Sequence, residues 1–241
     1  MCEQFVASAA EPFRIDEVWP FTQQLERFGI AGFGWGAAWL GEDGRIHAHR
    51  DIRAFRDDPN RETVGRTETT SLLVHLRRPS RLSTIALADT QPFDDPDGRY
   101  AFSHNGDFER HAERRAAYRA QGRIQGRADT EVGARWLEDS WDSGASVPRL
   151  LETLHETFGG LANLAVLSRD GEVWHYAGNR DNPVFTFRLG GVHFASTGLY
   201  SLDRSLFRLV APGATERRLV PLRTTAALEP QGLAEAIVTT R

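Results

Sequence analysis

The residue at position 2 is the first in the chain that could do chemistry. Cys2 is the only cysteine among the 241 residues, and it directly follows the initiator methionine. Once Met1 is removed, as processing tends to do before a small residue, the Cys2 thiol lies beside its own α-amine. An α-amino group titrates near about pH 7.7–8.0, so part of it can accept the thiol proton at neutral pH. Cys2 is therefore a candidate nucleophile; the alternative interpretation is a small thiol without a function.

Two absences in the composition exclude other kinds of chemistry. All 29 residues counted as lysine or arginine are arginine, which excludes a P-loop lysine, a Schiff-base lysine and a Ser–Lys dyad. One cysteine excludes an internal disulfide, a multi-cysteine zinc site and an iron–sulfur cluster. His47 and His49 alternate near Asp51, but no further ligand follows at a recognisable spacing. We therefore expect neither a metal site nor a cofactor.

Four short stretches hold the other residues that could do chemistry. They are Phe-Gly-Trp-Gly at 33–36, His-Leu-Arg-Arg-Pro-Ser at 75–80, Ser-His-Asn-Gly-Asp at 103–107 and Ala-Asp-Thr-Glu at 128–131. Taken singly, each also has a purely structural interpretation. Asn105 with the glycine after it is typical of a hairpin turn, and Asp129 is placed to cap a helix. Arg77 could be solvated at a strand end, and His75 and His104 could be packing residues.

The pattern of apolar and turn residues predicts the elements that must position these side chains. Strands are expected at 1–8, 33–40, 45–52, 71–76, 100–104, 161–167, 172–177, 184–189 and 192–196. Helices are expected at 17–28, 107–121, 130–142 and 148–158. The chain from Pro212 onward has no clear pattern. Because strands and helices come in separate clusters, the fold class is α+β rather than a parallel doubly wound sheet.

Composition and charge are those of an ordinary globular protein. Hydrophobic residues make up 40% and charged residues 26%, with a net charge of −4, and no linker divides the chain. We expect one domain over residues 1–241, in the cytoplasm, without a signal peptide or membrane span. Arginines recur every four residues from Arg115 to Arg127, and we interpret this ridge as a solvated helix face rather than a nucleic-acid site.

Taken together, the motifs resemble the class II, N-terminal nucleophile glutamine amidotransferase family, in particular its stand-alone bacterial members. The shared features are Cys2, Gly-Trp-Gly at 34–36, His-Leu-Arg at 75–77, Gln-Pro-Phe at 91–93, His-Asn-Gly at 104–106 and Asp-Thr-Glu at 129–131. Their order and approximate spacing match the family pattern over residues 2–200. The resemblance implies a four-layer αββα sandwich, in which two antiparallel sheets lie between helices and the nucleophile begins an inner strand.

The resemblance also implies a role for each residue. Cys2 attacks the side-chain amide of glutamine, and the Asn105 side chain and the Gly106 N–H stabilise the oxyanion. Arg77 holds the α-carboxylate through its planar fork, and Asp129 accepts hydrogen bonds from the α-ammonium. His75 and Ser80 flank Arg77 as further substrate-binding candidates. The products are glutamate and ammonia, formed through a γ-glutamyl thioester, and an ammonia-accepting synthetase would be a separate protein.

Departures from the family pattern affect the rim of the substrate pocket rather than the reacting groups. Phe33 and Ala128 stand where the family often has Asp and Ser, Asp89 replaces an Asn, and Pro79 fixes the backbone after Arg77 and Arg78. Two alternatives to a glutaminase therefore stay open. One is a hydrolase of larger γ-glutamyl amides, as in ergothioneine biosynthesis. The other is a protein without catalysis that binds a glutamyl ligand or senses redox state through Cys2.

Overall fold

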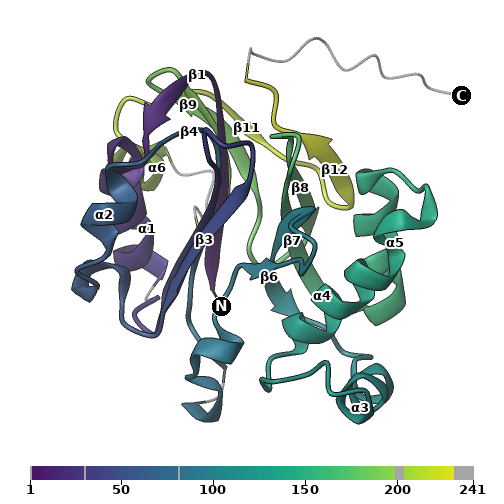
Figure 1. Ribbon diagram of the computed structural model, residues 1–241. Coiled ribbons are helices and arrows are strands. Elements are labelled where there is room, and N and C mark those ends of the chain that lie inside the picture. The colour runs from purple at the N-terminus through teal and green to yellow at the C-terminus, as the bar shows by residue number, and fades with distance from the viewer. Residues whose placement is uncertain (1, 30, 81, 199–203, 231–241) are drawn as a thin grey trace, which may run out of the picture.

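The computed structural model describes residues 2–29, 31–80, 82–198 and 204–230, which form two antiparallel sheets packed face to face between layers of helices. In Figure 1, α1, α2 and α6 lie on the outer side of one sheet, and α4 and α5 cover the outer face of the other, with α3 packed against α4. This arrangement confirms the expected four-layer αββα sandwich. Within the described residues, no helix has the length and apolar character needed to cross a membrane.

Seven strands form the first sheet, in the order β11-β9-β10-β1-β4-β2-β3. They are β1 (Glu3–Arg14), β2 (Trp35–Leu40), β3 (Ile46–Asp51), β4 (Glu68–Leu76), β9 (Phe185–Leu189), β10 (Val192–Ser196) and β11 (Thr215–Leu219). The second sheet has the order β12-β8-β7-β6-β5. Its strands are β5 (Phe93–Asp94), β6 (Tyr100–Asp107), β7 (Leu161–Ser168), β8 (Val173–Gly178) and β12 (Thr224–Ala227).

The helices connect and cover these strands. They are α1 (Trp19–Gly29), α2 (Arg61–Gly65), α3 (Ala112–Ala120), α4 (Asp129–Ser140), α5 (Val147–Phe158) and α6 (Arg204–Val210). Short 3-10 helices lie at Ile15–Val18, Phe55–Asp57, Leu82–Thr84, Leu87–Asp89 and Trp141–Ser143. Pro148 lies in the first turn of α5 and Gly159 follows its end, as the sequence predicts.

The alternation of side chains along β1 divides the core into layers. Phe5 and Ala7 point to the helix side, where Phe5 packs edge-on against Phe21 of α1 with ring centroids 5.3 Å apart. Val6 lies in the core between the two sheets, which combines alanines such as Ala38 and Ala165 with valines and leucines and has no aromatic side chain among its buried members. Small residues let the sheets approach closely, so polar groups at the ends of inner strands of both sheets come within hydrogen-bond distance.

Several element boundaries differ from those that the sequence predicts. β1 continues to Arg14, past a register shift between Ser8 and Phe13 that interrupts its pairing with β4. The helix expected from residue 107 begins at Ala112, because β6 extends to Asp107. β11 and β12 lie in the part of the chain without a clear pattern.

Candidate active site

Cys2 lies at the start of the central strand of the first sheet. β1 pairs with β4 on one side and β10 on the other, and the register that opposes Glu3 to Leu76 brings Cys2 beside the residues that follow β4. The Cys2 Sγ accepts a hydrogen bond from the Arg78 backbone N–H at 3.3 Å and lies 3.6 Å from the Arg78 carbonyl oxygen, to which it can donate. The thiol is half-buried. A segment 76 residues away in the chain therefore holds the nucleophile candidate.

The surroundings of the Cys2 thiol keep it protonated. Burial raises its pKa above the ordinary value of 9.0, while the Arg78 N–H and the Arg77 guanidinium lower it in part. The resting group at neutral pH is therefore a thiol, and a reaction at this sulfur needs a base to remove the proton.

Arg77 brings an incompletely paired guanidinium to the same place. Its side chain is 5% exposed, and burial lowers its pKa. Nη2 donates to the Thr84 carbonyl oxygen, whereas Nη1 is buried without a hydrogen-bond partner among the described residues. The Arg77 backbone pairs with the segment before β2, through bonds to Gly34 O at 2.8 Å and from Phe33 N at 3.2 Å. A buried, unpaired guanidinium donor is typical of a site that receives a carboxylate or phosphate.

Asn105 and Gly106 end the opposing inner strand β6. The Asn105 side chain is fully buried; its Nδ2 donates to the Thr197 Oγ1 at 3.2 Å, and its Oδ1 has no partner among the described residues. At position 106, a Cβ would lie 1.6 Å from the Leu161 carbonyl oxygen. Glycine at 106 is therefore required for β6 and β7 to pair at this point, rather than for a hairpin turn.

A buried polar network connects Asn105 to the strand that carries Cys2. Thr197 Oγ1 donates to the Glu3 Oε2 at 2.7 Å and accepts from the Gln4 backbone N–H at 2.9 Å. Asn182 Nδ2 donates to the same Glu3 oxygen at 3.1 Å and to the Cys2 carbonyl oxygen at 3.4 Å. Glu3, Thr197 and Asn182 are not predicted from the sequence. The available signals were a carboxylate next to Cys2, a polar residue directly after β10, and an asparagine in the turn after β8.

Asp129 lies at the first residue of α4, next to β6. Its Oδ2 accepts a hydrogen bond from the Phe108 backbone N–H at 2.7 Å and lies 3.8 Å from the His104 Nδ1. The expected capping role is wrong: Ala128 occupies the N-cap position, and Asp129 bonds across to the end of β6 instead. Asp89 accepts hydrogen bonds from the backbone N–H groups of Arg127 and Ala128, which fixes the loop before Asp129.

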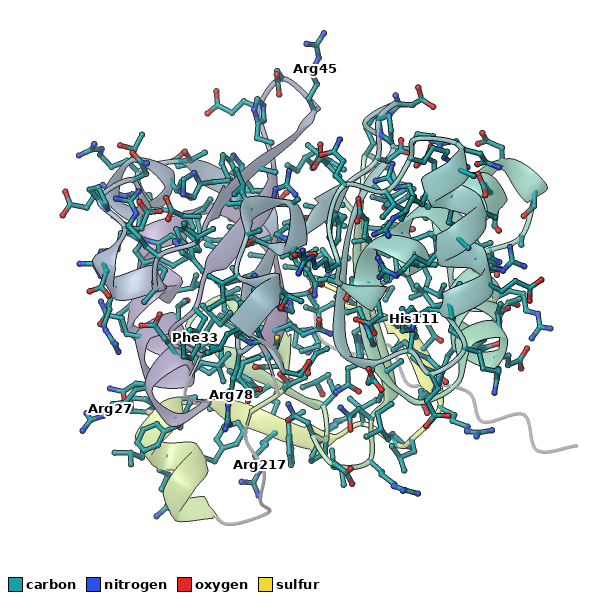
Figure 2. The ribbon with its side chains drawn as sticks, turned by 90° about the horizontal axis from the view of Figure 1, so that it is seen from below. Arg27, Phe33, Arg45, Arg78, His111 and Arg217 are labelled. Carbon is teal, nitrogen blue, oxygen red and sulfur yellow. The ribbon has the colours of Figure 1, made fainter. Side chains whose placement is uncertain are left out.

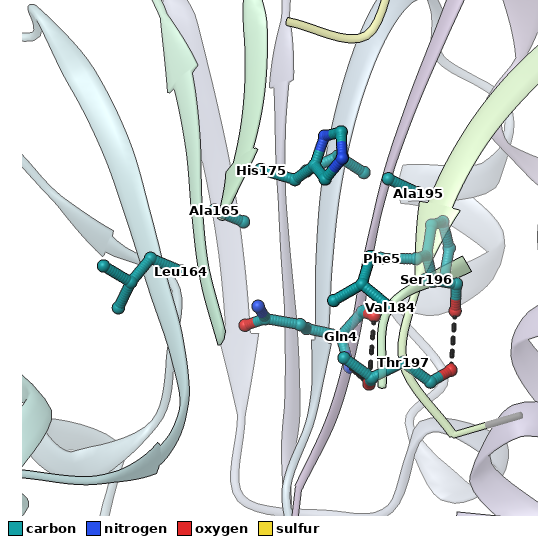
Figure 3. Close-up of a pocket in the computed structure, with 10 residues that line it drawn as sticks. Gln4, Phe5, Leu164, Ala165, His175, Val184, Ala195, Ser196 and Thr197 are labelled. Carbon is teal, nitrogen blue, oxygen red and sulfur yellow. Dashed lines mark hydrogen bonds between the residues drawn. The ribbon is translucent and has the colours of Figure 1, made fainter. Parts of the chain in front are cut away.

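His75 lies between the sheets. It is fully buried, and burial lowers its pKa from 6.5 to about 3, so the ring is neutral. Its Nδ1 donates to the Ser103 Oγ at 2.8 Å, and this hydroxyl donates to the Gln4 Oε1 at 2.8 Å. Gln4 and Thr197 also line a small cavity between the sheets, about 10 Å³ in volume (Figure 3). Ser80, by contrast, is exposed beyond Arg77.

No model of a known protein family and no curated protein matches the sequence. Among solved structures, the chain is similar to glutamine phosphoribosylpyrophosphate amidotransferase from B. subtilis, described as complexed with ADP and GMP. The TM-score is 0.72 at 18% identity, over 94% of this chain and 47% of that one.

Two further structures are similar to this chain. One is described as the allosteric regulatory enzyme of purine biosynthesis, with a TM-score of 0.73 at 17% identity, over 94% of this chain and 46% of that one. The other is a glutamine aminotransferase class-II domain protein from Silicibacter pomeroyi, with a TM-score of 0.51 at 18% identity, over 82% of this chain and 89% of that one. The chain spans about half the length of the first two structures.

The chain has the fold of a class II glutamine amidotransferase domain. This confirms the fold that the sequence motifs predict, with an N-terminal nucleophile candidate on an inner strand. Within this amidotransferase fold, Cys2 precedes β1, Arg77 follows β4, and Asn105 lies near the end of β6. Hydrogen bonds through Thr197, Glu3 and Asn182 connect Asn105 to Cys2.

Two other groups singled out in the sequence lie outside this end of the amidotransferase fold. In the arginine ridge, Arg115 donates to the carbonyl oxygens of Gly126 and Ala128, and Arg123 forms an ion pair with Asp139 at 2.8 Å. Arg115 therefore ties α3 to the loop before α4, and Arg123, which lies in that loop, ties the loop to α4. The helix ends at Ala120, so the ridge is not a continuous helix face.

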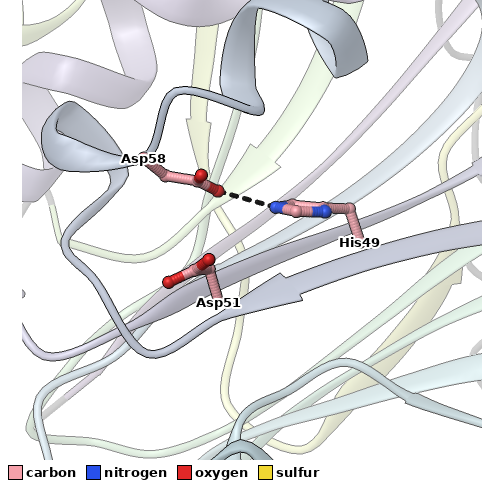
Figure 4. A group of neighbouring side chains, drawn as sticks. All are labelled: His49, Asp51 and Asp58. Carbon is pink, nitrogen blue, oxygen red and sulfur yellow. Dashed lines mark hydrogen bonds and ion pairs between the residues drawn. The ribbon is translucent and has the colours of Figure 1, made fainter.

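His49, Asp51 and Asp58 form the second group, with one ligand atom from each within 4.8 Å of the others (Figure 4). The His49 Nε2 lies 2.7 Å from the Asp58 Oδ2, which also accepts from the Trp35 indole N–H at 3.1 Å. The Arg53 Nη2 contacts Asp51 at 2.6 Å and Asp58 at 3.0 Å. A guanidinium thus supplies the positive charge between these carboxylates, and the donor set fits an ion-pair cluster that anchors Trp35.

Proposed function

We propose that the protein hydrolyses the side-chain amide of glutamine, or of a γ-glutamyl compound, with Cys2 as the nucleophile. The observation that carries this proposal is the thiol at position 2 next to a buried arginine whose Nη1 has no partner among the described residues. A nucleophile alone is compatible with many reactions. Its combination with an unpaired carboxylate receptor selects substrates that carry a carboxylate a fixed distance from the reacting carbon.

The reaction begins with removal of the thiol proton. Because the Cys2 pKa is raised, the α-amine that removal of Met1 would expose is the base in this proposal. Sulfur attacks the amide carbon, and the carbonyl oxygen becomes an oxyanion that accepts hydrogen bonds from the Asn105 side chain and the Gly106 N–H. The tetrahedral intermediate collapses as the protonated α-amine of Cys2 returns its proton to the leaving nitrogen, which departs as ammonia or an amine. Water then hydrolyses the γ-glutamyl thioester and releases glutamate and the thiol.

Two charged residues are proposed to hold the glutamyl group. Arg77 binds the α-carboxylate through its forked donors, and Asp129 accepts hydrogen bonds from the α-ammonium. Asp129 is partly exposed and keeps one carboxylate oxygen beyond the bond to Phe108, which supports this role. His75 and Ser80 stay predicted neighbours of the substrate. A neutral His75 contributes hydrogen bonds rather than charge.

One observation favours a substrate larger than glutamine. Phe33 hydrogen-bonds through its backbone to Arg77 and is 38% exposed, beside Arg78 on the face that Figure 2 shows. An exposed ring at the rim offers apolar surface to a leaving amine that carries more than hydrogen. We therefore keep γ-glutamyl amide hydrolysis as the second candidate function. If glutamine is the substrate, a separate synthetase that accepts ammonia is the proposed partner.

Turnover assays with the purified protein test both candidates. The protein is incubated with L-glutamine, and separately with γ-glutamyl amino acids, and released glutamate is quantified. We expect turnover of at least one substrate, and its loss in Cys2→Ala. D-glutamine serves as the control, because its α-groups cannot meet Arg77 and Asp129 in the same geometry. Binding of a glutamyl ligand without any release of glutamate would leave the protein without catalysis and refute the proposal.

A further inference from the structure

We propose that Thr197, held by Glu3, is a positioning residue that fixes the Asn105 side-chain amide with its nitrogen, not its oxygen, available to an oxyanion. This inference rests on the proposed function, in which Asn105 stabilises the oxyanion. It concerns two residues that do not themselves touch the reacting atoms.

The hydrogen inventory of Thr197 determines the orientation of the amide. A threonine hydroxyl has one hydrogen to donate and two lone pairs to accept with. The Glu3 Oε2 lies 2.7 Å from the Thr197 Oγ1 and also accepts from the Asn182 Nδ2, whereas the Gln4 carbonyl oxygen lies 3.3 Å away, so the Thr197 hydrogen is placed on the Glu3 Oε2. The Gln4 backbone N–H, at 2.9 Å, occupies one lone pair. Only the second lone pair is left for Asn105, so the atom that faces Thr197 must be a donor.

Asn105 satisfies this requirement through its Nδ2, 3.2 Å from the Thr197 Oγ1. One of its two amide hydrogens is used in this bond, and the other is available to an oxyanion. If the amide were flipped, Oδ1 and the Thr197 oxygen would face each other without a hydrogen between them. This repulsion is unscreened, because Glu3, Asn105 and Thr197 are each at most 1% exposed.

The same carboxylate also anchors the nucleophile. Asn182 bridges the Glu3 Oε2 and the Cys2 carbonyl oxygen, at 3.1 Å and 3.4 Å. The Thr197 backbone N–H donates to the Gln4 carbonyl oxygen at 3.0 Å, which fixes the chain around the hydroxyl. Glu3 therefore holds both the oxyanion donor and the residue that attacks, and a change of its hydrogen-bonding pattern alters the site without moving a reacting group.

Thr197→Val is the sharpest perturbation, because it keeps the shape of the side chain and removes the hydroxyl that accepts from the Asn105 Nδ2. Without this acceptor the Asn105 amide is free to flip. We expect kcat to fall on the order of 10²-fold, the effect of losing one oxyanion donor, with KM nearly unchanged. Thr197→Ser keeps the hydroxyl and should retain activity. Thr22→Val is the matched control, a buried threonine in α1 whose hydroxyl bonds to Val18 O.

Alkylation of Cys2 by iodoacetamide separates positioning from a general structural role. This alkylation forms no oxyanion, so its rate should change less than about threefold in Thr197→Val while amide hydrolysis falls. Equal loss of alkylation and hydrolysis would mean that the network only supports the fold, and would overturn the inference.

The orientation of Asn105 is also measured directly, independently of turnover. In ¹⁵N-edited NMR, a nuclear Overhauser contact is expected between the Asn105 amide protons and the Thr197 γ-methyl group in the wild type and in Thr22→Val. Its loss in Thr197→Val, measured to the γ-methyl groups at the same position, would support the inference, and its persistence there would overturn it. A wild-type protein that shows the contact but cleaves no γ-glutamyl amide would refute the proposed function instead. If Thr197→Val does not fold, Thr197→Ala and Thr197→Ser carry the kinetic test.

Discussion

Replacement of Arg77 by methionine should weaken substrate binding without destabilising the protein. Methionine has a similar length but no charge, and it suits the 5% exposed position of the side chain. In the substrate-free protein the arginine is a buried cation with one nitrogen, Nη1, unpaired among the described residues. Most buried side chains that make hydrogen bonds contribute to stability; this one is expected to contribute to binding instead.

The magnitudes follow from the hydrogen bonds of Arg77. In the wild type, the buried Nη1 donor without a partner destabilises the folded protein by about 1–3 kcal/mol, and methionine removes this penalty. The same substitution also removes the bond from Nη2 to the Thr84 oxygen, which costs about 1 kcal/mol of stability. Arg77→Met should therefore leave the free energy of unfolding unchanged or raise it by up to about 2 kcal/mol. Loss of one partner of a buried carboxylate pair costs about 2–5 kcal/mol, so KM for the γ-glutamyl substrate should rise by about 30-fold to 5,000-fold.

Urea unfolding and steady-state kinetics measure the two effects on the same preparation. Arg27→Met is the matched control, because Arg27 is an exposed arginine on the face that Figure 2 shows and stacks on Phe28 with its guanidinium carbon 5.8 Å from the ring. It should leave both KM and stability nearly unchanged. A variant Arg77→Met that loses more than about 2 kcal/mol of stability while KM stays within threefold of the wild type would refute the reasoning, because Arg77 would then serve the fold.

Three further outcomes follow from the same contacts. Gly106→Ala should destabilise the protein by several kcal/mol in thermal or urea unfolding, because its Cβ would lie 1.6 Å from the Leu161 oxygen. A Gly106→Ala variant as stable as the wild type would show that β6 and β7 can separate at this point without cost. His75 has a pKa lowered from 6.5 to about 3, so the unfolded chain binds its proton first and stability falls as pH falls through this range. In His75→Gln, the free energy of unfolding measured in urea should fall less steeply between pH 6.5 and 3, with a slope smaller by up to about 1.4 kcal/mol per pH unit. An unchanged slope would contradict the lowered pKa of His75. Asp58→Asn should cost about 3–5 kcal/mol of unfolding free energy by leaving buried partners unpaired, whereas Asp57→Asn at an exposed position should cost almost nothing, and equal losses would argue against the cluster.

Several elements of the fold could be predicted from the sequence because their signals are local. The hairpin of β2 and β3 follows from its Gly-Glu-Asp-Gly turn, and α5 from its apolar spacing with Pro148 and Gly159. β11 and β12 could not be predicted, because they are edge strands without a buried face; most residues of β11 are exposed. The alternation that identifies a strand depends on one face being buried.

The candidate site likewise has residues that the sequence identifies and residues that it does not. Cys2, Arg77, Asn105 and Asp129 lie in short motifs, so their residue types alone mark them. The network around Glu3 has no such motif, since its bond to Thr197 joins residues 194 positions apart. That contact depends on β10 lying beside β1, and strand order is not encoded in any local pattern. For the same reason, the sequence marks His75 as a site residue but does not predict its bond to Ser103 across the sheets.

Intact-mass spectrometry before and after exposure to a glutamine-mimicking diazoketone tests whether Cys2 is a processed nucleophile in a glutamyl site. We expect a protein that lacks Met1 and gains one label, with no label in Cys2→Ala and slower labelling in Arg77→Met. This result would establish a processed nucleophile in a site that recognises the glutamyl group. A protein that retains Met1 and takes no label would contradict the account, because the thiol would have no neighbouring α-amine and the arginine no glutamyl ligand.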